Sequence, residues 1–485
     1  ALYNYLFARK MNGRFILRIE DTDQNRYVEG AEQYIVESLK WLGITPDEGP
    51  GFGGDHGPYR QSERKALYAK FAEELVKKGH AYYAFDSSED LSKMRAEQEA
   101  KGFHSAKYDA RTRGGMKNSL TLSGEALEDK MHNSPDKVIR LKMPMSETVS
   151  FDDMVRNRVS FNTDELDDKV ILKADGMPTY HLANIVDDHL MGITHVIRGE
   201  EWLSSTAHHV LMYRFFGWEP PVFTHLPLLL KPSGKGKLSK RDGAKFGFPV
   251  FPMAWDAGED QYAGFREEGY DPAALLNFLV LLGWNPGNDQ EIMSVEEMIQ
   301  LFDLGQIVKS GARFDIEKAQ WFNQQYLLSY DAGHIWRQAE RYYPQEVKDN
   351  YSEEFILAQI DMMKPRVHLY SELYHTSSYF FDAPSDYDEK QVRKRYRDDV
   401  PEQLLQLKAV MEALEIWDAD NLSQLVKGYL NDKGLKMGVY LPLLRIIMCG
   451  AMTGPDLFEL MALVGKNETM LRLSAAMDSW TDLTH

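Results

Sequence analysis

The sequence contains a single cysteine, and this scarcity excludes two kinds of site. Cys449 has no second thiol with which to form an intramolecular disulfide, and the chain cannot build a zinc site from several cysteines. The sequence also lacks an apolar run long enough to span a membrane. These absences predict a cytoplasmic protein in a reducing compartment, with no membrane partner.

Positive charge is also scarce, because 56 lysines and arginines stand against 74 aspartates and glutamates and give a formal net charge of -18. So acidic a chain does not suit a general coat protein for nucleic acid, although a local basic patch can still bind phosphates. One such patch is "KGKLSKRDG" (235–243), within a stretch (231–245) that holds six basic side chains and one acidic one. The positive charge is therefore densest where a few phosphate groups could bind.

The basic loop lacks the spacing G-x-x-x-x-G-K-[ST], which excludes a P-loop. Lys237 and Lys240 lie three residues apart with Ser239 between them, and nearby glycines let the backbone move. Two ammonium groups and a hydroxyl could stabilise the charge of a leaving pyrophosphate. The alternative, for any lysine-rich stretch, is a solvated surface loop.

Hydrophobic patterns divide the chain into an α/β part and a helical part. Buried strands are predicted at 15–19, 169–174 and 195–198, and neighbouring amphipathic helices favour a parallel sheet. The segment from Tyr82 to about residue 167 is polar and rich in turn residues, which is typical of an insertion. From about residue 271 onward only helical patterns occur, so the C-terminal half is predicted to be helical.

Five stretches give the chain a family resemblance. They are "LRIEDTD" (17–23), "GPYRQSER" (57–64), "PTYHLANIVDDHLMGITHVIRGEEWL" (178–203), "KLSKR" (237–241) and "FDIEKAQWFNQQYL" (314–327). On these stretches the chain resembles the bacterial glutamyl-tRNA synthetases, a family of class I aminoacyl-tRNA synthetases, over essentially its whole length. The family's first signature, His-x-Gly-His, is absent, and in the family it precedes a stretch like "ALYNYLFARK" (1–10). We expect the protein as made to carry that signature ahead of residue 1.

The resemblance implies an α/β fold, with a Rossmann-like parallel-sheet catalytic domain of class I, an inserted α+β domain and an all-helical anticodon-binding half. It also implies a monomer. The implied domains are the catalytic domain (1–80 and 167–230), the inserted acceptor-binding domain (81–166), the signature-loop and stem-contact domain (231–310), and two helical anticodon-binding subdomains (311–380 and 381–485).

The resemblance assigns residues to an ATP site. Lys240 is the strongest candidate for binding the phosphates, and its charge suits that role. The other implied ATP-site residues are Lys237, Ser239, Leu238, Leu230, Glu201 and Trp202. The two leucines are expected near the adenine, and a plain core tryptophan is the alternative for Trp202.

An amino-acid pocket is implied at the ends of two predicted strands, where open α/β sheets bind ligands. Arg198 is implied to bind the side-chain carboxylate of glutamate, since a guanidinium can donate two parallel hydrogen bonds to it. Glu20 can hold the ammonium group, and Tyr180 and Asn184 match further pocket positions. The alternative for Arg198 is a surface arginine at a strand end.

Three stretches are implied to contact tRNA. Arg366 matches an anticodon-reading position, and Arg26 matches a contact to the acceptor end. The stretch "VRKRYR" (392–397) places four cations, Arg393 and Arg395 among them, around an aromatic residue, which suits a phosphate backbone. A solvated helix face is the alternative for this stretch.

Several histidines suggest a metal site only weakly. The spacing of His181, Asp188 and His189 fits no standard site, and His208 and His209 are interpreted as packing or surface residues of a predicted helix. The sequence therefore predicts no bound metal and no zinc in the protein, while Mg²⁺ is expected to accompany ATP.

The function that the resemblance implies is ATP-dependent activation of L-glutamate to glutamyl-adenylate and transfer to the 3′ end of tRNA(Glu). Three alternatives stay open: a glutaminyl-tRNA synthetase, a non-discriminating glutamyl-tRNA synthetase and a non-catalytic tRNA-binding protein. Glutaminyl relatives read the anticodon with β-barrels, which the helical C-terminal patterns disfavour. A short tRNA-modifying paralogue would end near residue 300.

Overall fold

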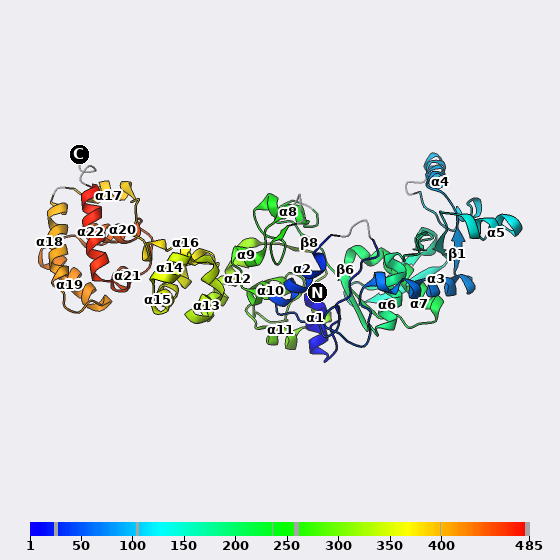
Figure 1. Cartoon of the computed structure of the whole chain (residues 1–485), viewed down its shortest axis with the longest axis horizontal. Helices are drawn as coiled ribbons and strands as arrows, with labels where there is room; N and C mark the ends of the chain where they lie inside the picture. The colour runs from blue at the N-terminus through cyan, green and yellow to red at the C-terminus, as the bar shows by residue number, and fades with distance from the viewer. Residues whose placement is uncertain (24–27, 103–105, 235, 257–260, 398, 481–485) are drawn as a thin grey trace. The chain divides into compact units, whose positions relative to one another are not determined.

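The computed structural model describes residues 1–23, 28–102, 106–234, 236–256, 261–397 and 399–480, without the side chains of Lys240, Arg241 and Ala244. The chain divides into two compact units, which are described separately (Figure 1). The first contains Ala1–Phe246 and Leu276–Asp315, and the second contains Gly247–Asp256, Gln261–Leu275 and the chain from Ile316 onward.

A mixed, largely parallel sheet forms the centre of the first unit. Its strand order is β4 (Asn157–Asn162), β3 (Thr148–Asp153), β7 (Val222–Leu226) and β6 (His195–Gly199). Strand β7 runs parallel to both β3 and β6, and β4 returns antiparallel to β3. In the register of β6 and β7, Arg198 lies opposite His225, so the end of the predicted strand 195–198 has a second strand beside it.

Two of these strands, β3 and β4, lie within the segment (81–166) that the resemblance assigns to the inserted domain. They nevertheless extend the sheet of β7 and β6, because β3 pairs with β7. A second, antiparallel sheet has the order β1 (Ala81–Ala84), β2 (Val138–Leu141) and β5 (Val170–Leu172), and the same region contains α4 (Ser88–Ala100) and α5 (Gly124–Asn133). The division into domains stays a prediction.

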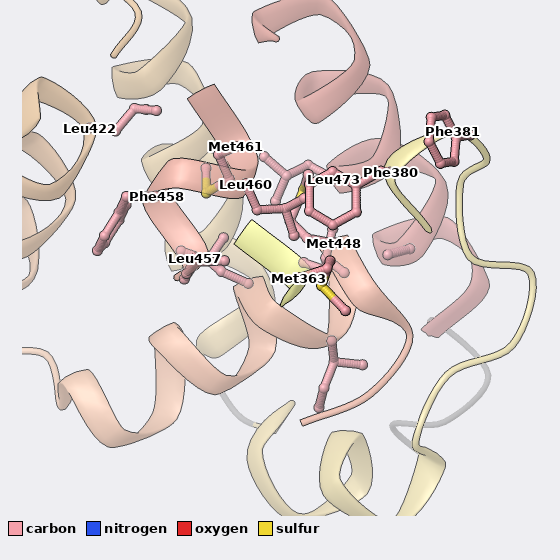
Figure 2. Close-up of a cluster of buried hydrophobic side chains, with 14 of the residues drawn as sticks. Met363, Phe380, Phe381, Leu422, Met448, Leu457, Phe458, Leu460, Met461 and Leu473 are labelled. Carbon is pink, nitrogen blue, oxygen red and sulfur yellow. The ribbon is translucent and has the colours of Figure 1, made fainter. Parts of the chain in front are cut away.

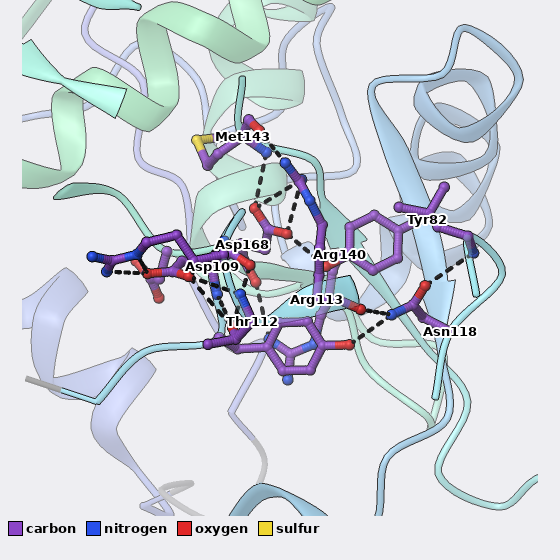
Figure 3. Close-up of polar contacts among 12 residues, drawn as sticks. Tyr82, Asp109, Thr112, Arg113, Asn118, Arg140, Met143 and Asp168 are labelled. Atoms are coloured by element: carbon purple, nitrogen blue, oxygen red, sulfur yellow. Dashed lines mark hydrogen bonds and ion pairs between the residues drawn. The ribbon is translucent and has the colours of Figure 1, made fainter. Parts of the chain in front are cut away.

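A buried ion pair connects the smaller sheet to the loops around it (Figure 3). The carboxylate of Asp168 is fully buried, accepts a hydrogen bond from the Tyr82 hydroxyl at 2.6 Å and pairs with Arg113 at 3.1 Å. Arg113 also donates to the carbonyl of Met143 at 2.8 Å, and Asp168 accepts the backbone N–H of Met143 at 2.9 Å. Each charge thus has an opposite charge and further hydrogen bonds, which burial of charged groups requires.

Two helices pack together beside the larger sheet. Helix α6 (Tyr180–Leu190) contacts α7 (Leu203–Phe216), and α7 contacts β3. A turn of 3₁₀ helix (Glu200–Trp202) leads from β6 into α7. Helix α7 ends at Gly217, whose φ of 81° is the left-handed conformation that glycine adopts without strain.

The predicted strand at 15–19 is extended but is not a continuous strand. Ile16 and Ile19 form single parallel bridges with Glu48 and Arg60. Between these two partners the opposite chain turns repeatedly through glycines with positive φ, such as Gly51 at 81°. A continuous ladder cannot form against a chain that turns in this way.

The first unit contains further helices and short strands. They are α1 (Leu2–Lys10), α2 (Ala31–Trp41), α3 (Lys65–Lys77), β8 (Leu229–Leu230), α8 (Lys240–Phe246), α11 (Val295–Leu301) and β11 (Ala312–Arg313). Strand β8 pairs with β11 in parallel. Helix α10 (Pro272–Leu281) begins in the second unit and ends in the first.

The second unit is almost entirely helical, as the sequence predicts, apart from the short antiparallel pair β9 (Trp255–Asp256) and β10 (Gln261–Tyr262). Figure 2 shows part of its core, in which Met363, Met448 and Met461 lie among leucines and phenylalanines. Its helices are α9 (Phe265–Glu268), α12 (Ile316–Ser329), α13 (Ala332–Ala339), α14 (Gln345–Asn350), α15 (Glu353–Met363), α16 (Glu372–His375), α17 (Glu389–Arg395), α18 (Val400–Glu412), α19 (Ala419–Asp432), α20 (Met437–Cys449), α21 (Leu457–Val464) and α22 (Lys466–Trp480). No helix in the described residues of the chain has the length and apolar character needed to cross a bilayer.

Candidate active site

Arg198 lies at the carboxyl end of β6 and donates four hydrogen bonds. Its Nε donates to Nε2 of His225 at 3.2 Å, and its Nη1 donates to the Tyr180 hydroxyl at 3.2 Å. Its Nη2 donates to Oγ1 of Thr206 at 2.8 Å and contacts Nδ1 of His209 at 3.2 Å. All four partners are uncharged as acceptors, so the described residues supply no carboxylate to Arg198.

A second arginine, Arg18, lies in the extended segment that ends at Glu20. Its Nη2 donates to Oδ1 of Asn184 at 2.9 Å and to Oε1 of Glu20 at 3.2 Å, and its Nη1 donates to Oδ1 of Asp188 at 2.9 Å. Sequence reasoning missed Arg18. The available signal was its place two residues before Glu20, because alternate residues of an extended chain share a face.

The four predicted glutamate-binding residues come together through these two arginines. Tyr180 and Asn184 stand four residues apart on α6 and therefore share a face of the helix. Asn184 contacts Arg18, which also holds Glu20, while Tyr180 contacts Arg198. Their roles stay predictions, but they line one small region at the ends of the chain segments that were expected to form the pocket.

Trp202 lies against this region. Its ring is tilted by 34° against that of Tyr180, with the ring centroids 4.3 Å apart. The side chain is only partly buried. Trp202 can therefore offer an aromatic face to a ligand that lies next to the tyrosine.

The basic loop folds back on β8. The backbone N–H of Leu238 donates to the carbonyl of Leu229 at 2.8 Å, and Lys237 forms a bridge with Leu230. Both Leu230 and Leu238 are half-buried. The ammonium of Lys237 contacts Oε1 of Glu201 at 2.5 Å, so two of the predicted ATP-site residues pair with each other.

Ser239, which was predicted to bind phosphate, is hydrogen-bonded to Asp242 at the start of α8. Its backbone N–H and its hydroxyl donate to Oδ2 of Asp242 at 2.8 and 2.6 Å, and Lys231 pairs with the other oxygen at 2.9 Å. The Ser239 hydroxyl and the Lys231 ammonium lower the pKa of Asp242 to about 2. Lys240 is the first residue of α8, and its side chain lies outside the description.

The arginines predicted to contact tRNA differ in whether their side chains already have partners within the protein. Arg26 lies outside the described residues. Arg366 is exposed at the end of a turn of 3₁₀ helix, and no ion pair or hydrogen bond to its side chain occurs within the described ranges. Arg393 is exposed and reaches Glu389 at 3.5 Å, whereas Arg395 is partly buried and donates to the side chain of Gln391 at 2.5 Å.

The histidines considered for a metal site have other partners. Asp188 pairs with Arg18, His189 stacks on Trp218 at 3.8 Å, and Nδ1 of His181 contacts Nε2 of His209 at 3.1 Å. Across the described ranges, no three histidine, cysteine, aspartate or glutamate side chains are arranged to hold a metal ion.

Comparison with protein families divides the chain in two. Residues 1–321 match the catalytic domain of the class I tRNA synthetases for glutamate and glutamine. Residues 322–477 match an anticodon binding domain. Together the two matches cover nearly the whole sequence.

Relatives and solved structures are similar over almost their full length. The chain is 49% identical over 479 residues to a glutamate–tRNA ligase of Flavobacterium psychrophilum, covering 98% of this chain and 95% of the relative. It is 49% identical over 486 residues to a glutamate–tRNA ligase of Bacteroides thetaiotaomicron, with coverages of 99% and 94%. A crystal structure of a glutamate tRNA ligase from Elizabethkingia meningosepticum, in complex with its amino acid, superimposes with a TM-score of 0.93 at 46% identity and covers 99% of this chain and 95% of that one. The glutamate–tRNA synthetase structure from Elizabethkingia anophelis gives a TM-score of 0.91 at 45% identity, with coverages of 98% and 95%.

Proposed function

The chain belongs to the class I tRNA synthetases for glutamate and glutamine, and from this premise we propose that it joins glutamate to tRNA at the expense of ATP. Its relatives at nearly half identity over the full length are glutamate–tRNA ligases. ATP, glutamate and tRNA are accordingly its substrates, and the chain is an aminoacyl-tRNA ligase.

The single observation that supports glutamate most directly is the charge around Arg198. Its guanidinium has only uncharged acceptors among the described residues, so a substrate carboxylate can compensate its charge. Glu20 lies nearby, held by Arg18, and its carboxylate can receive the ammonium group of an amino acid. Arg198 and Glu20 are linked through Tyr180 and Asn184 of α6. A cation and an anion placed in this way suit a substrate with an anionic and a cationic end.

In the activation step, the α-carboxylate of glutamate attacks the α-phosphorus of ATP, and pyrophosphate leaves as the acyl-adenylate forms. We propose that Lys237 and Lys240 stabilise the charge that develops on pyrophosphate. Lys237 can exchange its contact with Glu201 for a phosphate, because both side chains are about half exposed, at 54% and 41%. Such a reaction depends on placement and charge stabilisation rather than on a protein nucleophile.

In the transfer step, the terminal ribose hydroxyl of the tRNA attacks the carbonyl carbon of the acyl-adenylate, the ester to the tRNA forms, and AMP leaves. The helical second unit matches an anticodon binding domain, so we propose that it recognises the anticodon and that exposed Arg366 contacts a base there. A folded single-stranded loop presents base edges to such a side chain, and arginine donates a rigid pair of hydrogen bonds to them.

Mg²⁺ is proposed to enter bound to ATP. The phosphates of ATP would supply ligands to the ion together with water. We further propose that the protein binds no zinc, acts as a monomer and is located in the cytoplasm, as predicted from the sequence.

The proposal is tested by ATP–pyrophosphate exchange with glutamate, glutamine or no amino acid, each with and without tRNA(Glu). A glutamate ligase exchanges with glutamate only, and we expect exchange to require the tRNA. Exchange driven by glutamine would favour the glutaminyl alternative, and charging of tRNA(Gln) with glutamate would favour a non-discriminating enzyme. Binding of tRNA without exchange under any condition would contradict the proposed catalysis.

A further inference from the structure

We propose that His209 and His225 are positioning residues for Arg198, because as neutral acceptors they fix its guanidinium and leave its charge and one N–H for the substrate carboxylate. The proposal rests on the proposed function, since it takes Arg198 as the residue that binds that carboxylate. His209, interpreted from the sequence as a packing or surface residue, is buried on α7, and the proposal adds a positioning role to it. His209 and His225 are both fully buried, and each contacts Arg198.

The contacts of Arg198 occupy four of its five N–H groups. His225 takes the Nε–H, His209 and Thr206 take both N–H groups of Nη2, and Tyr180 takes one N–H of Nη1. The second N–H of Nη1 has no hydrogen-bond partner in the part of the chain that the structure describes. Two parallel hydrogen bonds from Arg198, as the sequence predicted, would therefore require one of these contacts to break.

Tyr180 supplies the second donor instead. Its oxygen accepts a hydrogen bond from Arg198, and its own proton is left to donate to a ligand. Burial raises the pKa of this hydroxyl, so it keeps its proton at neutral pH. A carboxylate can thus bridge Nη1 of Arg198 and the hydroxyl of Tyr180.

The tautomer of His225 is fixed by Asp153. Both side chains are fully buried, and Nδ1 of His225 lies 2.7 Å from Oδ2 of Asp153. Because a carboxylate only accepts, the proton is on Nδ1, and Nε2 carries the lone pair that faces Nε–H of Arg198. Asp153 belongs to β3, His225 to β7 and Arg198 to β6, so three neighbouring strands of the sheet hold the guanidinium.

The tautomer of His209 follows from its two neighbours. Its Nδ1 faces the guanidinium of Arg198 and must accept, so its Nε2 carries the proton and donates to Nδ1 of His181 at 3.1 Å. Burial lowers the pKa of His209 well below its usual value and lowers that of His181 to about 4. Both rings are therefore neutral at neutral pH.

Neutral acceptors matter because they orient a charge without cancelling it. A carboxylate at the position of either histidine would also hold Arg198, but it would pair with the charge and weaken the attraction for a substrate carboxylate. Since glutamate and glutamine differ by that charge, the arrangement favours glutamate.

The kinetic test replaces each histidine and compares KM for glutamate with KM for ATP in tRNA-dependent exchange. His209→Phe keeps a ring but removes the acceptor, and we expect KM for glutamate to rise about tenfold or more with KM for ATP nearly unchanged. His209→Asn places an oxygen near the former Nδ1 and should recover part of the loss. His208→Phe is the matched control. His208 is buried and precedes His209 on the same helix, but it contacts Asp167 rather than Arg198. This variant should therefore leave KM for glutamate unchanged.

Asp153→Asn tests the tautomer of His225. Oδ1 of Asp153 accepts two backbone N–H groups, those of Val155 and Arg156 at 3.0 and 2.8 Å, whereas Oδ2 accepts one, that of His225 at 3.1 Å. An asparagine there is therefore expected to keep its oxygen toward Val155 and Arg156 and to turn its amide N–H₂ toward His225. The proton of His225 then moves to Nε2 and faces Nε–H of Arg198. We expect KM for glutamate to rise in this variant as well.

A second measurement does not depend on catalysis. Nuclear magnetic resonance of the full chain with ¹⁵N-labelled histidine should show His225 protonated on Nδ1 and His209 on Nε2, and Asp153→Asn should move the His225 proton to Nε2. A charged ring or the opposite tautomer in the wild-type protein would overturn the proposal. So would equal rises in KM for glutamate and for ATP, or a rise in His208→Phe equal to that in His209→Phe. If the wild-type protein shows no glutamate-dependent exchange, the proposed function fails, and the tautomers still decide whether the histidines hold Arg198 as described.

Discussion

Two arginines of the first unit have opposite surroundings. Arg113, beside the smaller sheet, pairs with the buried carboxylate of Asp168, as Figure 3 shows, whereas Arg198, at the end of β6, contacts only uncharged acceptors in the described structure. Partly burying an uncompensated charge costs free energy, so such a charge is expected where a ligand will compensate it. The compensated arginine stabilises the fold, and the uncompensated one is available for the reaction.

Arg18 stands between these two cases. It pairs with Asp188 and Glu20, so its charge is compensated by the protein, but it also donates to Asn184. Its pKa lies above the usual value because nearby Asp188 and Glu20 outweigh the effect of burial. Arg18 therefore suits the task of orienting two pocket residues and not that of attracting an anion itself.

The largest expected effect is on stability at the compensated arginine. Arg113→Ala leaves the buried carboxylate of Asp168 without its partner, and we expect a loss of about 3–5 kcal/mol in the free energy of unfolding. Denaturant unfolding followed by circular dichroism measures this loss. Arg214→Ala is the control, because Arg214 pairs with Glu147 at the surface, where exposed pairs contribute at most about 1 kcal/mol. Similar losses in both variants would mean that burial does not distinguish the two arginines.

The next effect is on substrate binding at the uncompensated arginine. Arg198→Ala removes a hydrogen bond to a charged group, and we expect a loss of about 1.5–3 kcal/mol for glutamate, or roughly a 10- to 150-fold rise in KM. Exchange kinetics should show little change in KM for ATP. Unfolding should show a smaller loss of stability than in Arg113→Ala, because the buried acceptors His209 and His225 lose a donor but no carboxylate of the described structure loses its partner. A variant that unfolds as readily as Arg113→Ala would place Arg198 among the structural charges.

A local pattern was sufficient to predict that Arg198 ends a strand, whereas its role in binding glutamate was implied by the family resemblance. Two β-branched apolar residues, Val196 and Ile197, precede the cation, and the strands of open parallel sheets end at ligand sites. The helical second unit was likewise predictable, since amphipathic periodicity is also local.

The surroundings of Arg198 could not be predicted in the same way. His225 meets it through the register of two strands, Asp153 lies a strand further away, and His209 comes from a helix. The segment 15–19 was predicted to be a strand but forms only isolated bridges, for a related reason. Its own hydrophobic pattern does not show whether the chain that it pairs with is extended. Contacts between distant segments decide both features.

A smaller effect is expected in the second unit, where Arg366 and Arg395 repeat the contrast. Arg366 is exposed with its donors available in the described structure, while Arg395 already donates to Gln391 and to the carbonyl of Gly438. We expect Arg366→Ala to weaken tRNA(Glu) binding by about 1–3 kcal/mol and to reduce discrimination against a changed anticodon base. Arg395→Ala should weaken tRNA binding less than Arg366→Ala does. The loss should be the same for tRNA(Glu) and for the tRNA with the changed anticodon base. Equal losses of discrimination would remove the assignment of Arg366 to the anticodon.

The smallest effect is expected at Glu201, whose contact with Lys237 is an ion pair between two half-exposed groups. Burial opposes the charged form of Glu201, but the hydrogen bond from Lys237 outweighs it and lowers the pKa. Because water and salt screen such a pair, Glu201→Gln should change the free energy of unfolding by less than about 1 kcal/mol, and the change should shrink further in 1 M salt. Denaturant unfolding at low and high salt measures both, with Glu147→Gln as the matched control at another surface pair. A loss as large as that of Arg113→Ala would show that Lys237 stabilises the fold as Arg113 does. The ammonium of Lys237 would then not be available to bind pyrophosphate.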